Sequence, residues 1–166
     1  MSATPWDHEP GWVLLSYRLP REPSTPRISV WRKLKRLGVA QLGDGLVALP
    51  HDARTREQLE WVAEEVVQAG GTAVVWVGRP TQAAAEQDLA AALTEARAAE
   101  YREVLAEATG ALTLDQAGRR AAARRLRQEL NRIQRRDYFP PPERDRARAT
   151  VAELAGDRHQ DVEQRV

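Results

Sequence analysis

Hydrophobic positions in the first 40 residues predict a strand followed by a helix. The strand is expected over residues 11–19, where the continuous apolar run at residues 12–15 is typical of a strand buried on both faces. The helix is expected from Thr25, as the N-cap, to Leu37, with Gly38 as the stop. Its apolar stripe comprises Val30, Leu34 and Leu37.

Two short apolar runs and a second helical pattern come next. Residues 39–42 and 46–49 flank Gly43-Asp44-Gly45, and glycines around a short polar residue favour a tight hairpin. A second helix is predicted over residues 56–69, with Thr55 as its N-cap. One face of this helix holds apolar residues at i, i+3, i+4 and i+7, namely Leu59, Val62, Ala63 and Val66.

The pattern of the first 80 residues ends with a fourth strand. Residues 72–77 (TAVVWV) are β-branched and aromatic, as strands prefer. The order is then strand, helix, two-stranded hairpin, helix, strand, which is the βαββαβ pattern of the ferredoxin-like sandwich. In that arrangement both helices cover the same face of a four-stranded sheet. We therefore predict an α+β fold with a ferredoxin-like domain over residues 11–80.

The sequence changes character at Thr81. Alanine, glutamate and arginine dominate beyond it, and nothing there has the pattern of a strand. The predicted helices cover residues 83–108, residues 114–136 after the N-cap Thr113, and residues 143–154 after three prolines. The parts expected around the sheet domain are a flexible lead-in at residues 1–10, an arginine-rich helical extension at residues 81–156 and a frayed tail at residues 157–166.

Composition narrows the class of protein. Of the 166 residues, 42% are hydrophobic and 30% are charged, which is typical of a soluble globular protein. The absence of cysteine excludes disulfides, thiolate catalysis and cysteine-based zinc sites. The first ten residues include Asp7 and Glu9 and no apolar run, unlike a signal peptide, and no stretch approaches the roughly 18 apolar residues of a membrane span. We expect a cytoplasmic protein without a membrane partner.

Local charge is more informative than the net charge of +1, because it is clustered. The first predicted helix carries basic residues on both sides of Trp31. They are Arg27, Arg32, Lys33, Lys35 and Arg36. Such a cluster is typical of a surface that binds nucleic acid or another anion.

A second basic cluster lies in the predicted helix at residues 114–136. It consists of Arg119, Arg120, Arg124, Arg125, Arg127, Arg132, Arg135 and Arg136. At 100° per residue, Leu126, Leu130 and Ile133 share a narrow stripe. Broadly opposite this stripe lie Arg120, Arg124, Arg127 and Arg135. Two interpretations stay open: a surface for nucleic acid, or a solvated helix paired with the acidic segment at residues 81–118.

Aromatic and titratable residues give weaker signals. Trp12, Trp31, Trp61 and Trp76 all fall in predicted elements, so we expect them to be core or packing residues, whereas Trp6 in the lead-in is a candidate cover for an apolar patch. The three histidines, His8, His51 and His159, are scattered along the chain. We therefore expect no catalytic residue and no metal ligand, at Asp7-His8-Glu9 or elsewhere.

Several motifs together resemble a known family. The first strand ends in Tyr17-x-x-Pro20, and Arg21-Glu22-Pro23 follows it. The first helix holds residues 31–38 (WRKLKRLG), and two later motifs are residues 100–103 (EYRE) and 136–139 (RDYF). In these features the chain resembles the N-terminal domain of the chromate-resistance regulators of the ChrB family, strongly to Pro80 and loosely beyond it.

The resemblance implies a chromate-responsive transcriptional regulator without catalytic activity. It adds Arg18 and Arg21 to the DNA-binding or anion-binding candidates, beside the first cluster and Arg120, Arg124 and Arg127. Chromate is a tetrahedral dianion like sulfate, which clustered arginines and backbone N–H groups bind. DNA is thus the expected partner, and an oxyanion, chromate or sulfate, is the expected ligand in place of a cofactor. Members of this family usually carry a second, C-terminal domain. The sequence shows no counterpart of it, so we expect a stand-alone form of the N-terminal domain.

Two other functions stay open. The βαββαβ order also resembles the small CRISPR-adaptation nuclease and the middle domain of the phenylacetate repressor. That nuclease family has an aspartate directly after the tyrosine that ends the first strand, where this chain has Arg18. Metal-dependent cleavage of a phosphodiester needs a carboxylate ligand, so Arg18 argues against nuclease activity. The other alternative is an interaction module that binds an acidic partner or forms a homodimer.

Overall fold

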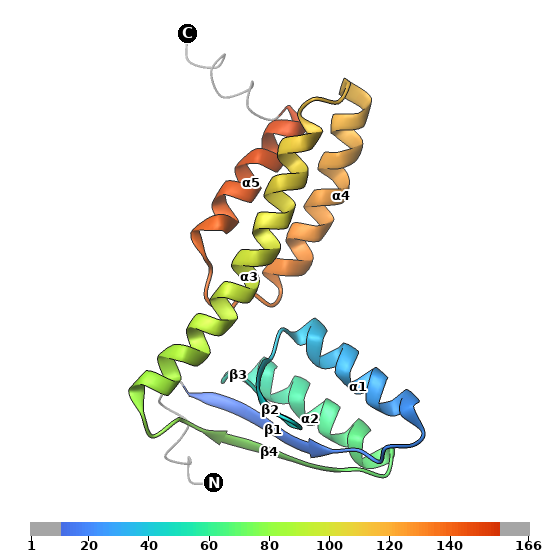
Figure 1. The fold of residues 1–166 in the computed structure, drawn as a ribbon, viewed down its shortest axis with the longest axis vertical. Coiled ribbons are helices and arrows are strands. Elements are labelled where there is room, and N and C mark those ends of the chain that lie inside the picture. The colour runs from blue at the N-terminus through green and yellow to red at the C-terminus, as the bar shows by residue number, and fades with distance from the viewer. Residues whose placement is uncertain (1–10, 157–166) are drawn as a thin grey trace. The chain divides into compact units, whose positions relative to one another are not determined.

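The computed structural model describes residues 11–156 of the chain. These residues form a mixed α+β structure with one four-stranded antiparallel sheet and five helices (Figure 1). The chain divides into two compact units, Met1–Ala90 and Ala91–Val166, within helix α3 (Ala83–Ala111). The predicted lead-in and tail, with Trp6, His8 and His159, lie outside the described residues, and the boundary expected at residue 80 stays a prediction.

The first unit contains the whole sheet. Its elements are β1 (Trp12–Arg18), α1 (Ser24–Leu37), β2 (Ala40–Gly43), β3 (Leu46–Pro50), α2 (Ala53–Gln68) and β4 (Thr72–Gly78), followed by the first turns of α3. The strand order is β2-β3-β1-β4, and every neighbouring pair is antiparallel. The predicted α+β class and the order of elements over residues 11–80 are confirmed.

One face of the sheet carries the core of this unit. Val13 and Leu15 of β1 lie opposite Leu49 and Val47 of β3, so their side chains share a face. Helices α1 and α2 both lie on one side of the sheet (Figure 1). The side chains that these helices bury are Val30, Leu34, Thr55, Leu59, Val62 and Val66. The apolar stripes expected from helical spacing therefore point into the protein.

Three of the four tryptophans expected to be core or packing residues are exposed. Trp31, Trp61 and Trp76 keep 51%, 60% and 55% of their surface accessible, so they are not core residues. Trp31 and Trp61 lie on helix positions outside the buried stripes, and Trp76 lies opposite Leu14 on the sheet face away from Val13 and Leu15. Of these four, Trp12 alone is buried, at 3%, and its indole Nε1 donates to Glu86 Oε1 at 3.1 Å.

Two helices of the first unit begin differently from the expectation. Helix α1 starts at Ser24 with Pro23 as its N-cap and no side-chain cap, so Thr25 is not the N-cap. Helix α2 is capped by Asp52, whose Oδ1 accepts a hydrogen bond from the Thr55 backbone N at 2.7 Å. The Thr55 hydroxyl accepts in turn from the Asp52 backbone N at 2.9 Å, which completes a capping box. Thr55 is thus the third helical residue, and this role buries it completely.

The second unit consists of helices that share one core. They are the remainder of α3, α4 (Gln116–Gln134) and α5 (Pro142–Ala155). The predicted α4 stripe is confirmed, because Leu126, Leu130 and Ile133 are buried together with Tyr101 and Val151. Their shared core is what holds this unit together.

The ends of these three helices also differ from the expectation. Helix α3 continues through Gly110 to Ala111, beyond the predicted end at residue 108. Helix α4 is capped by Asp115, not by Thr113, and the Asp115 Oδ1 accepts from the Gly118 backbone N at 2.8 Å. Helix α5 begins at Pro142, since a proline suits a first helical position that needs no N–H donor.

A backbone contact fixes the β2–β3 hairpin against the end of β1. The Tyr17 backbone N donates to the Gly45 carbonyl oxygen at 2.8 Å. Gly45 has φ of 72°, and a Cβ atom added there would lie 2.2 Å from the Tyr17 carbonyl oxygen. Only glycine meets both conditions. The hairpin tip is therefore held beside Tyr17 and Arg18.

The variant Gly45→Ala is expected to lose about 1–3 kcal/mol of unfolding free energy, because alanine is strained at positive φ and clashes with Tyr17. Urea unfolding followed by circular dichroism measures the loss. Gly43→Ala is the matched control in the same hairpin, since no atom lies within 4 Å of a Cβ built there. Equal losses in the two variants would contradict the role assigned to Gly45.

Candidate anion-binding groove

A groove of about 790 Å³ opens where β1 ends, in the first unit. Its lining comes from three segments: the end of β1, one face of α1 and the β2–β3 hairpin. The α1 residues follow the spacing i, i+3, i+4, i+7 and i+8, which puts them on one side of the helix. The lining residues are Tyr17, Arg18, Leu19, Ser24, Arg27, Ile28, Trp31, Arg32, Gln41, Asp44 and Gly45.

Three predicted basic residues meet in this groove. Arg18, Arg27 and Arg32 line it, and all three are exposed. None of them forms a side-chain hydrogen bond or ion pair with another residue in the described part of the chain. The one carboxylate in the lining is Asp44, so the groove carries a net charge of +2. Guanidinium groups in this setting attract anions, most strongly those with two charges.

Neutral donors complete the groove. Burial raises the pKa of Tyr17 above its usual value, although the positive charge of Arg27 acts against this. The phenol therefore keeps its proton at neutral pH and is able to donate a hydrogen bond to an anion. Lys35 is not among the lining residues, but its Nζ lies 4.6 Å from the centre of the ring of Trp31, which is.

Lys33 and Arg36 belong to a different side of α1. They line a smaller groove between α1 and α2, together with Trp61 and Glu65. Lys33 forms an ion pair with Glu65, whose other carboxylate oxygen accepts from the Ser29 hydroxyl at 2.9 Å. These contacts, with that from Lys33 the strongest, hold the pKa of Glu65 below its usual value. Lys33 is therefore already neutralised, unlike the three arginines of the first groove.

The remaining predicted candidates do not line the first groove. Arg21 is exposed in the segment between β1 and α1. Arg120, Arg124 and Arg127 are exposed on α4 in the second unit. Arg127 shares a shallow groove with Arg148 of α5, a residue that the sequence did not single out.

Ion pairs neutralise part of the second basic cluster. Within the second unit, Arg125 of α4 pairs with Glu107 of α3, and Arg132 pairs with Glu129 on its own helix at 3.0 Å. Arg136 pairs with Glu100 of α3. The interpretation of a basic helix paired with the acidic segment at residues 81–118 therefore holds for Arg125 and Arg136, whereas Arg132 is neutralised within its own helix. It does not extend to Arg120 and Arg124, which form no ion pair with any described residue.

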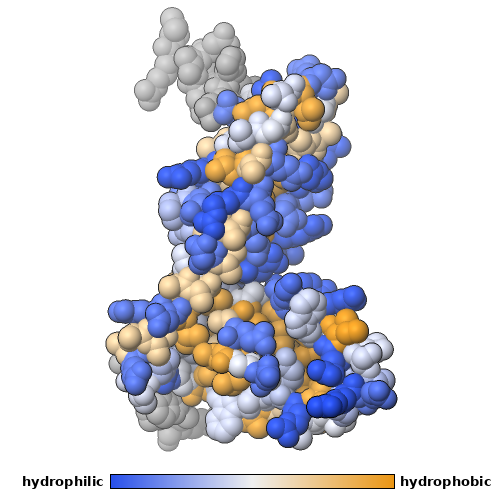
Figure 2. Space-filling model, viewed as in Figure 1, coloured by the Kyte–Doolittle hydropathy of each residue, from blue (hydrophilic) through white to orange (hydrophobic). Residues whose placement is uncertain are grey.

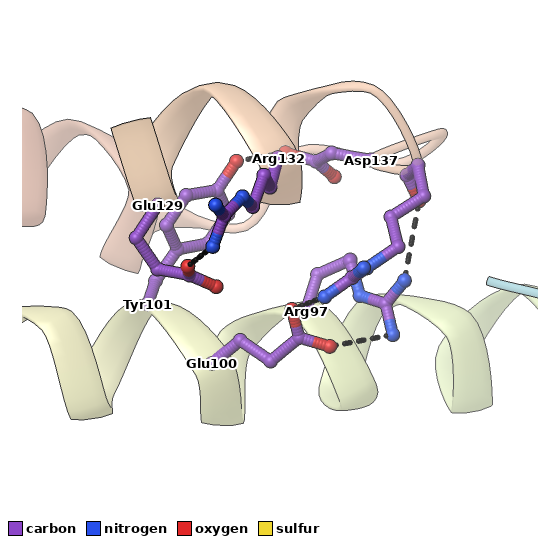
Figure 3. Close-up of polar contacts among 7 residues, drawn as sticks. Arg97, Glu100, Tyr101, Glu129, Arg132 and Asp137 are labelled. Carbon is purple, nitrogen blue, oxygen red and sulfur yellow. Dashed lines mark hydrogen bonds and ion pairs between the residues drawn. The ribbon is translucent and has the colours of Figure 1, made fainter. Parts of the chain in front are cut away.

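A buried polar network joins α3 to the end of α4 (Figure 3). Arg97, only 8% exposed, pairs with Glu100 at 2.8 Å and points its guanidinium toward the Arg136 carbonyl oxygen at 3.5 Å. The Tyr101 hydroxyl donates to Asp137 Oδ2 at 2.8 Å, and burial is the main cause that raises the pKa of Tyr101. The motifs at residues 100–103 and 136–139 thus meet in space.

No pattern in the sequence indicated that Arg97 is buried. Alanines surround it on α3, so no apolar stripe marks the buried face of that helix. The sequence feature that pointed to this network was the pair of motifs EYRE and RDYF. Tyr101 of the first motif and Asp137 of the second form its hydrogen bond between α3 and the segment after α4. Asp44 was expected to serve turn formation alone, and its place in the groove was missed.

Residues 11–156 contain neither a cluster of metal ligands nor a helix suited to a membrane. No group of three histidine or acidic side chains in this range is arranged to hold a metal ion. No helix in the same range has the length and apolar character needed to cross a membrane. Asp7-His8-Glu9, where no metal ligand is expected, lies outside the described residues.

Comparison with known proteins identifies the family. The family model described as Protein ChrB, N-terminal, matches residues 27–116, which is more than half of the chain. The chain belongs to the ChrB N-terminal family. Protein ChrB of Cupriavidus metallidurans is 31% identical over 144 residues, which cover 84% of this chain and 44% of that protein. The chain thus spans less than half the length of this curated relative, and no solved structure matches it.

The ChrB resemblance predicted from the sequence is confirmed. The family match begins at Arg27 and includes Arg32, so two of the three groove arginines fall within it. Arg18 precedes the match, and the motif at residues 136–139 follows it. The family model therefore covers the α1 side of the groove and begins after the strand that carries Arg18.

The Lys33–Glu65 pair predicts a pH dependence of stability. The pKa of Glu65 is lower in the folded chain, so its stabilising effect is complete above the unfolded pKa of about 4.3 and is lost as the pH falls through the folded value. Glu65→Gln should therefore flatten the loss of unfolding free energy on acidification, measured by urea titrations at several pH values. Glu64→Gln, next to it on α2 and exposed, is the control and should behave as the wild type.

The Tyr101–Asp137 contact predicts a second effect on stability. Tyr101→Phe removes the donor to a partly buried carboxylate whose Oδ1 already lacks a hydrogen-bond partner among the described residues. We expect a loss of about 1–3 kcal/mol in unfolding free energy. Tyr17→Phe is the control, because the Tyr17 hydroxyl makes no such bond within residues 11–156. A loss in the control as large as that in Tyr101→Phe would contradict the assignment.

Proposed function

We propose that this chain is a non-catalytic, chromate-responsive transcriptional regulator that acts in the cytoplasm. It binds DNA phosphates through Arg18, Arg27 and Arg32, and a tetrahedral dianion, chromate or sulfate, competes for the same groove. One observation carries this proposal: three exposed arginines from two elements line one groove without an ion-pair partner among the described residues. Membership of the ChrB family supports the chromate response.

The chemistry of the groove fits both anions. A phosphate diester and a tetrahedral dianion offer similar oxygen acceptors, and arginine binds two of them at once. The net charge of +2 would be balanced by one dianion. DNA would bind through several phosphates and release counterions, so the two ligands differ in their dependence on salt.

The proposal also assigns the sheet domain to the ferredoxin-like class, for which the antiparallel strand order β2-β3-β1-β4 is the expected one. One further feature supports a nucleic-acid role. Arg120 and Arg124, exposed on α4, would supply additional phosphate contacts from the arginine-rich extension.

Binding to duplex DNA from the chain's own promoter region, followed by fluorescence anisotropy over a series of salt concentrations, tests this function. We expect log K to fall linearly with log salt concentration. Arg27→Ala should weaken binding and reduce the salt slope by about 1, because one phosphate contact is lost. Chromate or sulfate, added at constant ionic strength, should displace DNA from the wild type more effectively than from Arg27→Ala.

Arg36→Ala is the matched control for charge. Arg36 is exposed on the same helix but lines the groove beside Glu65, so its removal should change the slope less. Absence of DNA binding at low salt would refute the proposal, and equal effects of Arg27→Ala and Arg36→Ala would refute the assignment to this groove.

A further inference from the structure

The two edges of the sheet are built differently. Strand β2 forms one edge with only four residues, and its pairing with β3 shifts register between Gln41 and Gly43. Short, bulged edge strands resist pairing with other chains. Strand β4 forms the other edge with seven residues in continuous register with β1 and no charged side chain. Only the β2 edge therefore carries a feature that prevents edge-to-edge association.

Strand β4 also presents large apolar side chains to solvent. Val74, Trp76 and Val77 are exposed by 49%, 55% and 37%. Figure 2 shows hydrophobic residues on the surface of the sheet-bearing unit, interspersed with hydrophilic ones. Because β4 pairs only with β1 among the described strands, half of its backbone N–H and C=O groups point away from the sheet without a strand partner.

We infer that β4 is the dimerisation edge of this protein, and that a second copy of the chain adds its own β4 in antiparallel orientation. An antiparallel pair of identical strands has a two-fold axis, so each copy contributes the same surface. With the axis at Val75, Val74 of one copy lies opposite Trp76 of the other. Four exposed apolar side chains then become neighbours on one face of a continuous eight-stranded sheet.

The charges and polar atoms around β4 favour a second copy. The strand has no charge that would repel its equivalent. Arg79, just beyond the strand, forms an ion pair with Glu86 at 3.0 Å. The Trp76 indole Nε1 already donates to the Ser16 hydroxyl at 2.9 Å, so burial in an interface leaves this donor satisfied.

Sedimentation of the full chain at increasing concentration tests the dimer. The wild type should approach twice the chain mass of 18.6 kDa, and added salt should not dissociate it, because the strand is uncharged. Val74→Lys should weaken dimerisation roughly tenfold or more, since a lysine would be buried without a partner. Leu114→Lys is the matched control, with the same exposed fraction of 49% but a position before α4. It should dimerise as the wild type does.

Single cysteines test the register, because the chain has none of its own. In the inferred pairing, the two Val75 Cα atoms lie about 4.5–5.5 Å apart, within disulfide range. Mild oxidation of Val75→Cys should therefore give a covalent dimer. Val77→Cys, on the same face of β4, is the control, since its two copies would be offset by four residues, about 13 Å, and should not crosslink.

Hydrogen exchange of the wild type is independent of any variant's folding. Amides of β4 should exchange more slowly at high than at low protein concentration, while those of β2 should not change. A monomer at all concentrations would overturn the inference, as would a dimer that Val74→Lys leaves intact. Slow, concentration-independent exchange of β4 in a monomer would assign the edge to a cover from the same chain, and would overturn it too.

Discussion

The first unit depends on strand β1, which is paired along both of its edges. Its register with β3 and β4 fixes which side chains enter the core and which face the other side of the sheet. The same register places Tyr17 and Arg18 at the end of the strand, where the hydrogen bond from Tyr17 to Gly45 holds the hairpin. The groove is therefore supported by a sheet and a packed helix, which hold the backbone of its three arginines in place.

Counting basic residues would not have located this groove. Lys33 lies on the same helix as Arg32, yet its ion pair with Glu65 neutralises it. Arg125 and Arg132 of α4, and Arg136 just beyond it, are neutralised in the same way by acids of α3 and α4. What distinguishes Arg18, Arg27 and Arg32 is that the fold gathers them and supplies one carboxylate, Asp44, for three positive charges. Selectivity among basic residues thus comes from the acids placed near each of them.

The elements of both units followed from the sequence, because the 3.6-residue spacing was clear in α1, α2 and α4, and short apolar or β-branched runs marked the strands. The helix starts did not follow, since several residues able to cap stand close together, as Asp52 and Thr55 do. The exposure of three tryptophans was not predicted, because the presence of a residue in a helix or strand does not show whether its side chain faces the core or the solvent. The groove was missed as a unit because its lining comes from three segments that only the fold brings together.

The network around Arg97 has a consequence for how this chain tolerates change. Two segments 36 residues apart in sequence share the contacts Tyr101–Asp137 and Glu100–Arg136. Loss of one member leaves a poorly solvated charge or a buried donor without its partner, which costs more than the contact itself contributes. Substitutions at these positions should therefore be correlated across related sequences: a change in one motif should accompany a compensating change in the other.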